Sequence, residues 1–156
     1  MMHARKEYAD LQKFAPDVYE TLRALGQQAA KAGIEKELLE LIKIRASQIN
    51  GCAFCVQFHI LQAESLGVSI DKLNLVAVWR EAPQFSVRER AALAWTEALT
   101  LISNGVSDEL YAEANAEFSE KELTYLTSAI ASINGWNRFG AAYRWTPPPR
   151  AKPRVA

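Results

Sequence analysis

Cysteine is scarce in this sequence, because Cys52 and Cys55 are the only two among its 156 residues. An excess of charge is also absent, since 18 Lys and Arg residues balance 18 Asp and Glu residues. A nucleic-acid-binding surface needs a concentration of basic side chains, so this balance argues against nucleic acid as the main partner. Only the segment 144–154 is locally basic, and we interpret it as a solvated tail.

Long apolar runs are missing as well. No segment approaches the roughly 20 apolar residues that a transmembrane helix needs, and the first residues lack the apolar core of a signal peptide. We therefore expect a cytoplasmic protein without a membrane partner. In such a reducing compartment, a lone pair of cysteines is more often catalytic or metal-binding than a structural disulfide.

Strand patterns do not occur either. No segment alternates apolar and polar residues over the length of a strand, and runs rich in Val, Ile and Thr between turn residues are missing. Helical signals fill the sequence instead, so we predict an all-α fold. The first three helices are expected over residues 16–32, over residues 35–50 and from near Cys52 to Gly67, with breaks at Gly33 and Gly51.

Capping boxes mark the starts of two later helices. In Ser86–Glu89 and Ser119–Glu122, the serine and glutamate side chains can satisfy each other's free backbone amides. Each helix that follows carries one apolar face at helical spacing. These faces consist of Ala91, Ala94, Trp95, Ala98 and Ile102 in the first helix, and of Leu123, Leu126, Ile130 and Ile133 in the second.

Turn and cap signals divide the rest of the chain. Val68 and Ser69 fit a hydrophobic staple and a helix cap, with Val68 packing on Leu73. A short helix is expected near residues 108–117, and the three prolines at 147–149 are expected to end the last helix. The sequence therefore predicts one helical domain over residues 1–146 and a proline-rich, basic, disordered tail over residues 147–156.

Six aromatic residues lie within these predicted helices or close to them. Aromatic side chains carry large apolar areas, so we expect them in the core or at a subunit interface. A few of them can instead line an apolar substrate channel beside Cys55. The six residues are Phe54, Phe58, Trp79, Trp95, Trp136 and Phe139.

A short internal repeat links two parts of the chain. Residues 48–52 read Gln-Ile-Asn-Gly-Cys and residues 132–136 read Ser-Ile-Asn-Gly-Trp, each after a leucine-rich helix. The match is short enough to arise by chance. The alternative is a duplicated helical unit whose second copy lost its thiols, with residues 136–138 packing where the first copy carries out chemistry.

The segment around the cysteines carries the strongest functional signal. Cys52 and Cys55 are three positions apart, close enough to form a reversible disulfide without a large backbone movement. His59 lies four residues after Cys55, on the same side of a helix, where it can take or return a thiol proton. The break at Gly51 can fold Glu40 over this pair, where a glutamate can orient His59 or act as the base itself. The pattern alone favours a solvated position for Glu40.

The two cysteines compete for the role of nucleophile. A free thiol with a pKa of about 8.5 is only a few per cent thiolate at neutral pH, so the site must lower that pKa or supply a base. The helix start after Gly51 favours Cys52, because free amides there provide partial positive charge. The contact with His59 favours Cys55. These patterns leave both assignments open.

The spacing of these residues resembles a known motif. Glu40, eleven further residues and then Cys52-x-x-Cys55-x-x-x-His59 are similar to the core motif of the alkylhydroperoxidase D (AhpD-like) branch of the carboxymuconolactone decarboxylase superfamily. The resemblance implies an AhpD-like all-helical fold that assembles as a homotrimer or a homohexamer. It extends over residues 15–145 and is clearest in segments 41–52, 73–83 and 133–138.

The resemblance also implies a reaction, the reduction of a hydroperoxide in antioxidant defence. By this resemblance Cys55 is the peroxidatic thiol and Cys52 the resolving one, while Glu40 and His59 form a proton relay. The Cys55 thiolate attacks the O–O bond and becomes a sulfenic acid, and Cys52 then closes the disulfide. An external dithiol, a lipoylated protein domain in the best-known relative, reduces it again. No cofactor is implied.

One position departs from the pattern of the branch. Its peroxidase type has a histidine immediately before the second cysteine, where this sequence has Phe54. The relay therefore has one proton carrier fewer, and an apolar ring borders the thiol. We expect this change to affect the rate and the substrate rather than the dithiol chemistry.

Three other functions compete with a thiol peroxidase. The superfamily's namesake decarboxylates a lactone without a redox dithiol, so the cysteine pair argues against that reaction or a related ring reaction. A zinc site would use Cys52, Cys55, His59 and Glu40, but structural zinc usually takes four ligands that are mostly Cys and His, and we expect no metal. A redox-sensing protein with little turnover is the third alternative, and Phe54 keeps it under consideration.

Overall fold

The computed structural model describes residues 5–151 and is helical throughout, which confirms the predicted fold class. Two 3₁₀ helices, η1 (Val76–Glu81) and η2 (Ile102–Asn104), lie on either side of α6 in the sequence. No helix within residues 5–151 combines the length and apolar character needed to cross a membrane. The α-helices are α1 (Tyr8–Phe14), α2 (Pro16–Lys31), α3 (Lys36–Ile49), α4 (Ala53–Ser65), α5 (Ile70–Asn74), α6 (Val87–Thr100), α7 (Asp108–Glu117) and α8 (Glu120–Tyr143).

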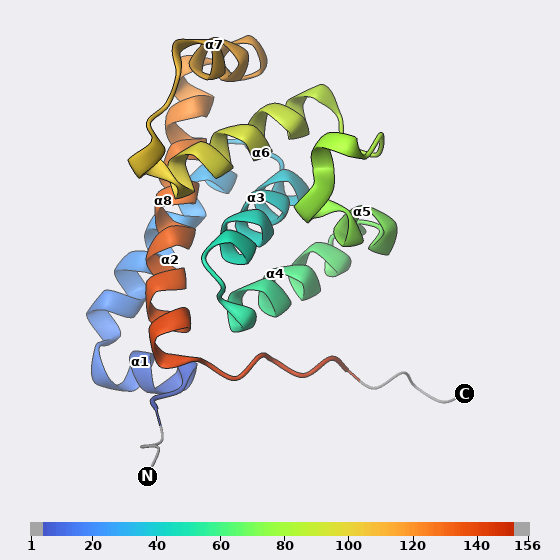
Figure 1. Cartoon of the computed structure of the whole chain (residues 1–156). Coiled ribbons are helices and arrows are strands. Elements are labelled where there is room, and N and C mark those ends of the chain that lie inside the picture. Colours follow the sequence, from blue (N-terminus) through green and yellow to red (C-terminus); the bar gives the residue numbers. More distant parts are fainter. Residues whose placement is uncertain (1–4, 152–156) are drawn as a thin grey trace.

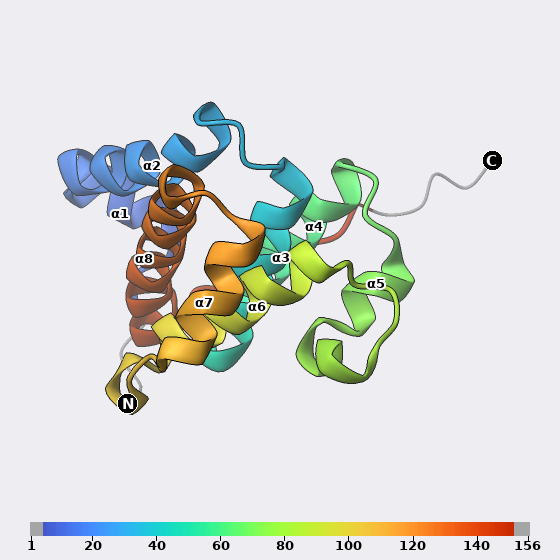
Figure 2. The ribbon, with the colours of Figure 1, turned by 90° about the horizontal axis from the view of Figure 1, so that it is seen from above.

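Helix α3 lies at the centre of the molecule, in contact with α2, α4, α6 and α8 (Figures 1 and 2). The long helix α8 runs beside α2 on one side of α3. Helix α3 is central because its apolar residues cover more than one face, and such a helix has to be surrounded by others. Five of its six leucine and isoleucine residues are less than 5% exposed: Leu38, Leu39, Leu41, Ile42 and Ile44.

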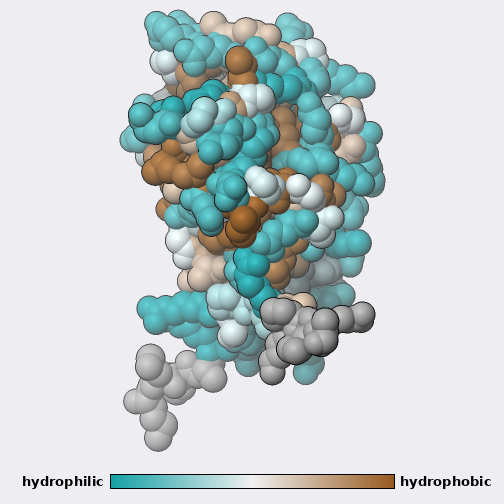
Figure 3. All heavy atoms as spheres, turned by 90° about the vertical axis from the view of Figure 1, so that its right-hand side faces the viewer, coloured by the Kyte–Doolittle hydropathy of each residue, from teal (hydrophilic) through white to brown (hydrophobic). Residues whose placement is uncertain are grey.

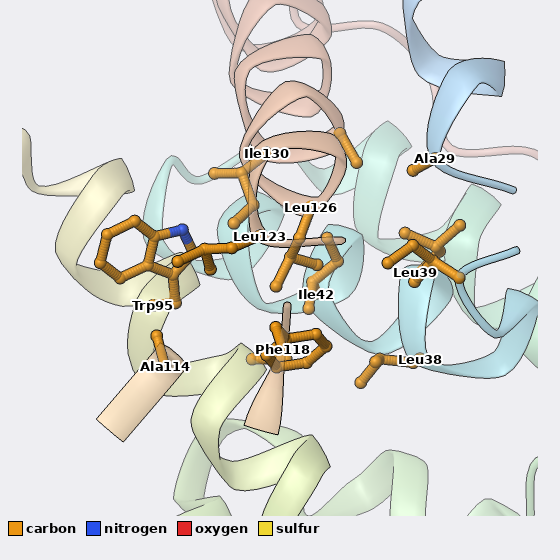
Figure 4. Close-up of a cluster of buried hydrophobic side chains, with 13 residues drawn as sticks. Ala29, Leu38, Leu39, Ile42, Trp95, Ala114, Phe118, Leu123, Leu126 and Ile130 are labelled. Atoms are coloured by element: carbon orange, nitrogen blue, oxygen red, sulfur yellow. The ribbon is translucent and has the colours of Figure 1, made fainter. Parts of the chain in front are cut away.

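Two clusters of buried apolar side chains pack against different faces of α3. Leu38, Leu39 and Ile42 belong to the first cluster, where they meet side chains from α2, α6, α7 and α8 (Figure 4). Leu41 and Ile44 belong to the second cluster, with side chains from α4, α5, η1 and α6. Burial on several faces fixes the rotation of α3, and it thereby fixes the direction in which Glu40 points.

Local signals in the sequence identified most helix starts. Both predicted capping boxes form, at the starts of α6 and α8, with hydrogen bonds between serine and glutamate in both directions. Ser69 caps α5, and α7 covers residues 108–117, as expected. The breaks at Gly33 and Gly51 have φ angles of 97° and 67°, a conformation that favours glycine. Trp79, Trp95 and the predicted apolar face of α8 are buried.

Three features differ from the predictions. Helix α1 was not expected. Helix α8 ends at Tyr143, before the prolines, because Arg144 adopts a left-handed conformation with a φ of 53° and its amide bonds back to Ala141 and Gly140. Ile102 does not extend the apolar face of α6, because that helix ends at Thr100 and Ile102 is 59% exposed.

The chain after α8 is tied to the domain as far as the structure describes it. Trp145 is buried, and Thr146 donates its amide and its hydroxyl to the carboxylate of Glu7. Arg150 forms an ion pair with Glu64 near the end of α4, with N and O 2.9 Å apart. Residues 152–156 of the predicted tail lie outside the described residues. The boundary at residue 146 and the disorder of the tail therefore stay predictions.

Candidate active site

The two cysteines lie at the junction between α3 and α4. Gly51 turns the chain, Cys52 is the N-cap of α4, and Cys55 lies in the first turn of that helix. The two sulfurs are bonded at 2.08 Å, and the backbone amide of Cys55 donates a hydrogen bond to Cys52 Sγ at 3.2 Å. Both residues are buried, with exposed fractions of 1% and 3%. The positive end of α4 therefore faces Cys52, as the position of Gly51 indicated.

Helix α8 packs directly against the disulfide at Gly140. A Cβ atom at this position would lie 2.4 Å from Cys52 Sγ and 3.0 Å from Cys55 Sγ. Figure 1 shows the first turn of α4 next to the C-terminal part of α8. Sequence analysis missed Gly140. The available signal was a glycine inside a predicted helix, where it costs about 1 kcal/mol relative to alanine and therefore needs a packing reason.

Gly140→Ala is expected to disturb the dithiol more than the fold. Alanine improves helix propensity, but its Cβ overlaps Cys52 Sγ, so the sulfur or the helix has to move at a cost of about 1–3 kcal/mol. We expect the equilibrium between dithiol and disulfide to shift by about tenfold or more toward the dithiol, as measured by titration with a dithiol buffer.

Gly135→Ala in the same helix is the matched control, because its added Cβ meets the end of the flexible Leu22 side chain at 3.1 Å. An unchanged redox equilibrium in Gly140→Ala would show that the close approach to the sulfurs is unimportant.

A network of amide side chains connects the cysteine turn to α8. Asn50 Nδ2 donates to Oδ1 of Asn134 at 2.9 Å and to Oδ1 of Asn137 at 3.0 Å. Asn137 is fully buried and donates in turn to the hydroxyl of Ser47 at 2.9 Å. The two asparagines of the internal repeat, Asn50 and Asn134, therefore meet in space. The helices differ, because α3 ends at the first copy and α8 continues through the second. Duplication stays a hypothesis.

Glu40 and His59 form the second part of the site. Glu40 is 8% exposed, and its carboxylate accepts hydrogen bonds from His59 Nδ1 and Lys43 Nζ, both at 2.7 Å. The contact arises because α3 and α4 pack side by side after the turn at Gly51. The solvated position that the pattern favoured for Glu40 is therefore wrong, and the alternative arrangement against His59 is the one observed.

The charges of this pair follow from burial and from Lys43. Burial raises the pKa of the Glu40 carboxyl, but the hydrogen bond from His59 and the positive charge of Lys43 outweigh it and hold that pKa below its usual value. Burial lowers the pKa of His59 by more than Glu40 raises it, so the imidazole is neutral near pH 7. An ionised Glu40 then fixes the proton on Nδ1 and leaves Nε2 free to accept another.

Acidification from about pH 7 to about pH 5 is expected to destabilise the fold through His59. The unfolded chain takes up a proton below the ordinary histidine pKa of about 6.5, whereas the folded chain does so only at lower pH. Stability is therefore fully present above that value and falls with decreasing pH, by at most about 1.4 kcal/mol per pH unit for one proton. Urea unfolding of the wild type and of His59→Gln at several pH values measures this.

The His59→Gln curve should be flatter over the same interval, since the variant lacks the titrating group. Parallel curves for the two proteins would contradict a depressed pKa at His59. His3, the only other histidine, lies outside the described residues and is common to both proteins.

The two sulfurs face different spaces. Cys55 borders a cavity of about 440 Å³ that Glu40 and His59 also line. Cys52 borders a more open groove of about 380 Å³, together with Gln57 and Pro147. Three of the six aromatic residues discussed above, Phe54, Phe58 and Trp136, line the cavity on the Cys55 side. Within residues 5–151, neither sulfur is hydrogen-bonded to His59. A proton that passes from a thiol to His59 therefore needs a bridging water or substrate.

The four residues considered as zinc ligands are engaged with one another in a different way. The two cysteines are bonded as a disulfide, and the carboxylate of Glu40 is shared between His59 and Lys43. Across residues 5–151, no three His, Cys, Asp or Glu side chains converge as a potential metal site.

Comparisons with known proteins agree with this fold. Residues 16–98 match the carboxymuconolactone decarboxylase family. The uncharacterized protein YdfG of Bacillus subtilis is 34% identical over 142 residues, which cover 90% of this chain and 95% of the relative. A crystal structure from Agrobacterium tumefaciens, a protein of unknown function provisionally assigned to the antioxidant defence protein AhpD, is 38% identical. Its TM-score is 0.87, and the match covers 95% of this chain and all of that one.

A more distant structure shares the fold and has a different named activity. The debrominase Bmp8, solved as a cysteine variant with 2,3,4-tribromopyrrole, is 18% identical with a TM-score of 0.77. The match covers 94% of this chain and 91% of Bmp8.

These similarities define the class of protein. The chain belongs to the carboxymuconolactone decarboxylase family. Within that family it lies in the AhpD-like branch, as the motif of Glu40, the two cysteines and His59 indicated.

Proposed function

We propose that the protein is a thiol-dependent peroxidase that reduces a hydroperoxide in antioxidant defence and is regenerated by an external dithiol. One observation carries the proposal: the sulfur of Cys55 borders the same cavity as the Glu40–His59 pair. A nucleophile, a base and a space for substrate are therefore adjacent, as a substrate-reducing thiol requires. The named lactone reaction of the family remains the alternative, and the redox pair argues against it.

The reaction consumes two electrons from the dithiol. His59 Nε2 takes the proton of the Cys55 thiol through a bridging water, and the thiolate attacks the terminal oxygen of the hydroperoxide. The O–O bond breaks, Cys55 becomes a sulfenic acid, and the organic oxygen leaves as an alcohol after taking the proton back from His59. Cys52 then attacks the Cys55 sulfur and releases water as the disulfide forms.

Glu40 contributes by orienting and polarising His59. Its carboxylate oxygen accepts a hydrogen bond from Nδ1 at an N–O distance of 2.7 Å, which keeps Nε2 as the proton acceptor and stabilises the imidazolium that forms during proton transfer. Phe54 supplies no second proton carrier beside Cys55. Among residues 5–151, His59 is therefore the single histidine available for proton transfer in the cavity. Its substitution should lower activity more than substitution of one histidine in a site that has two.

Regeneration requires access to a sulfur from outside. Cys52 borders the open groove, so an external dithiol can attack Cys52 there, while the alcohol formed by reduction of the hydroperoxide leaves on the Cys55 side. A lipoylated protein supplies such a dithiol. Because cytoplasmic thiol pools stay reduced, we place the cycle in that compartment.

Thiol counting combined with peroxide consumption tests the proposal. One equivalent of hydroperoxide should reduce the thiol count of the reduced protein from two to zero per chain, without covalent dimers on a non-reducing gel. Added dihydrolipoamide should restore both thiols and sustain turnover. Persistent thiols, or oxidation without any turnover by dithiols, would contradict a peroxidase, and the second result would favour a redox sensor.

The aromatic lining of the cavity favours one second candidate, the reductive removal of a halogen from an aromatic ring. The debrominase Bmp8 shares the fold, and a ring-shaped substrate fits walls that include Phe54, Phe58 and Trp136. This reaction also takes two electrons from a dithiol and leaves a disulfide and a halide. Bromide release from 2,3,4-tribromopyrrole by the reduced protein distinguishes it from peroxide reduction.

We also expect the protein to form a homotrimer or homohexamer. Apolar side chains emerge at the surface on the side where α5 lies (Figure 3). Leu66, Ile70 and Val78 are 37%, 49% and 54% exposed, and association would bury such side chains. Light scattering at micromolar concentration should give three or six times the chain mass of 17.4 kDa. A monodisperse monomer at that concentration would contradict this prediction.

A further inference from the structure

The cavity beside Cys55 is larger than hydrogen peroxide requires. Its volume of about 440 Å³ lies in the range of about 300–1,000 Å³ that holds small organic ligands. A hydroperoxide consists of a reacting O–O group and an organic group. Cys55, Glu40 and His59 are three of the 17 residues that line the cavity, so the other lining residues can contact the organic group.

Aromatic rings packed against one another form one wall of this space. Phe54 stacks on Tyr8, with centroids 4.9 Å apart and planes at 28°, and on Phe58, at 5.9 Å and 18°. Trp145 meets Phe54 edge-on at 5.4 Å. All four side chains line the cavity. These separations are typical of favourable aromatic pairs, so one further ring can join the arrangement.

The wall continues through Tyr19 and Trp136, whose rings meet edge-on at 5.6 Å. The hydroxyls of Tyr8 and Tyr19 are hydrogen-bonded to each other at 3.0 Å, which uses one of their two O–H donors. Two cations also line the cavity, but each is paired with a carboxylate: Arg23 with Glu20 and Lys43 with Glu40. The lining therefore offers ring faces and edges more than free charge.

The same wall holds a buried hydrogen-bond donor without a partner in the described part of the chain. Nε1 of Trp145 is buried and finds no acceptor within residues 5–151. A buried donor without a partner is unfavourable, and an oxygen atom of a ligand can satisfy it. The wall thus combines apolar rings with a small number of polar groups, as in sites that orient small organic molecules.

We propose that this cavity selects hydroperoxides whose organic group carries an aromatic ring, and that Phe54 determines this preference for aromatic substrates. The proposal rests on the peroxidase function above and names its substrate class. Phe54 occupies the position of the proton-carrying histidine in the peroxidase type of the branch. In this chain, a ring that stacks against Tyr8 and Phe58 replaces that histidine, so the departure changes specificity.

Two hydroperoxides that differ by one ring test the proposal. Cumene hydroperoxide carries a phenyl group where tert-butyl hydroperoxide carries a methyl group, on the same tertiary carbon. The second-order rate constant of thiol loss in the reduced protein should be higher for cumene hydroperoxide by a factor of about three to ten, since an aromatic contact contributes a factor of about two to ten. Rates near equality would overturn the proposal and leave the peroxidase function intact.

Variants connect the preference to the wall. Phe54→Leu should lower the ratio of the two rates toward one, and Phe58→Leu should do so independently if Phe54→Leu folds poorly. Phe14→Leu is the matched control, because Phe14 is 63% exposed and does not line the cavity. If the ratio of the two rates is unchanged in both cavity variants, Phe54 and the rings stacked on it do not determine the preference.

Binding separates this proposal from the reaction on which it rests. The unreactive alcohols 2-phenyl-2-propanol and tert-butanol match the two hydroperoxides in shape, and calorimetry measures their affinities for the disulfide form. Oxidation by neither hydroperoxide would overturn the peroxidase function. Tighter binding of the phenyl alcohol than of tert-butanol would still support an aromatic site. Equal affinities, or no binding of either alcohol, would overturn the proposal of an aromatic site.

Discussion

Cys55→Ser is expected to reduce peroxide consumption to the rate of the uncatalysed reaction, whereas Cys52→Ser should still consume one equivalent. The serine hydroxyl is a poor nucleophile, and Cys55 is the sulfur that borders the substrate cavity. In Cys52→Ser the sulfenic acid on Cys55 has no resolving partner and accumulates. Dimedone trapping followed by mass spectrometry should locate it on Cys55.

The fold itself provides a control for this pair. Cys52 is the N-cap of α4, and serine is among the residues preferred at that position, so Cys52→Ser should keep the helix start and the melting temperature. Loss of reactivity in Cys55→Ser then reports on chemistry. Dimedone on Cys52 of Cys55→Ser, with full peroxide consumption, would instead assign the nucleophile to the helix start. That outcome would mean that the positive end of α4 determines which thiol reacts, rather than the cavity and His59.

The helix starts were predictable because the atoms that determine them are close in sequence. A capping box needs only a serine and a glutamate three residues apart, and both examples form as expected. Helix α1 has seven residues and a capping box built from Glu7 and Asp10. A helix this short is marginal alone, and contacts distant in sequence support it, such as Arg5 with the carbonyl of Ala142. No local pattern contains that information.

The residues of the candidate site also separate into those that local sequence spacing predicts and those that depend on contacts distant in sequence. The dithiol and His59 lie within one turn or two of each other, so their proximity followed from helical spacing. The position of Glu40 depended on the angle at which α3 and α4 pack, and the pattern favoured the wrong alternative. Gly140 of α8 packs against the disulfide and Trp145 packs beside Gly140, and both are too distant in sequence from the cysteines for a spacing rule to predict. The motif resemblance supplied Glu40 because it encodes packing that the single sequence does not.

Glu40→Gln is expected to slow oxidation of Cys55 near neutral pH by about 10²–10⁴-fold, the range of a general-base contribution. The amide oxygen of glutamine can still accept a hydrogen bond from Nδ1 of His59, so the geometry persists. The negative charge that stabilises the developing imidazolium is lost, and Nε2 becomes a weaker base. The defect should shrink above about pH 8.5, where the thiol ionises unaided. Stopped-flow measurement of thiol loss between about pH 6 and about pH 9.5 gives both quantities.

Glu97→Gln separates this effect from stability. Glu97 is also a carboxylate with a lowered pKa, because hydrogen bonds from Trp79, Arg45 and Arg80 outweigh its burial, but it does not line the cavity. Both variants leave a cation without its partner, so both should lower the melting temperature. Only Glu40→Gln should slow thiol oxidation. Equal rates for the two variants at pH 7 would mean that the Glu40 charge serves the fold alone, and His59 would then act without a carboxylate behind it.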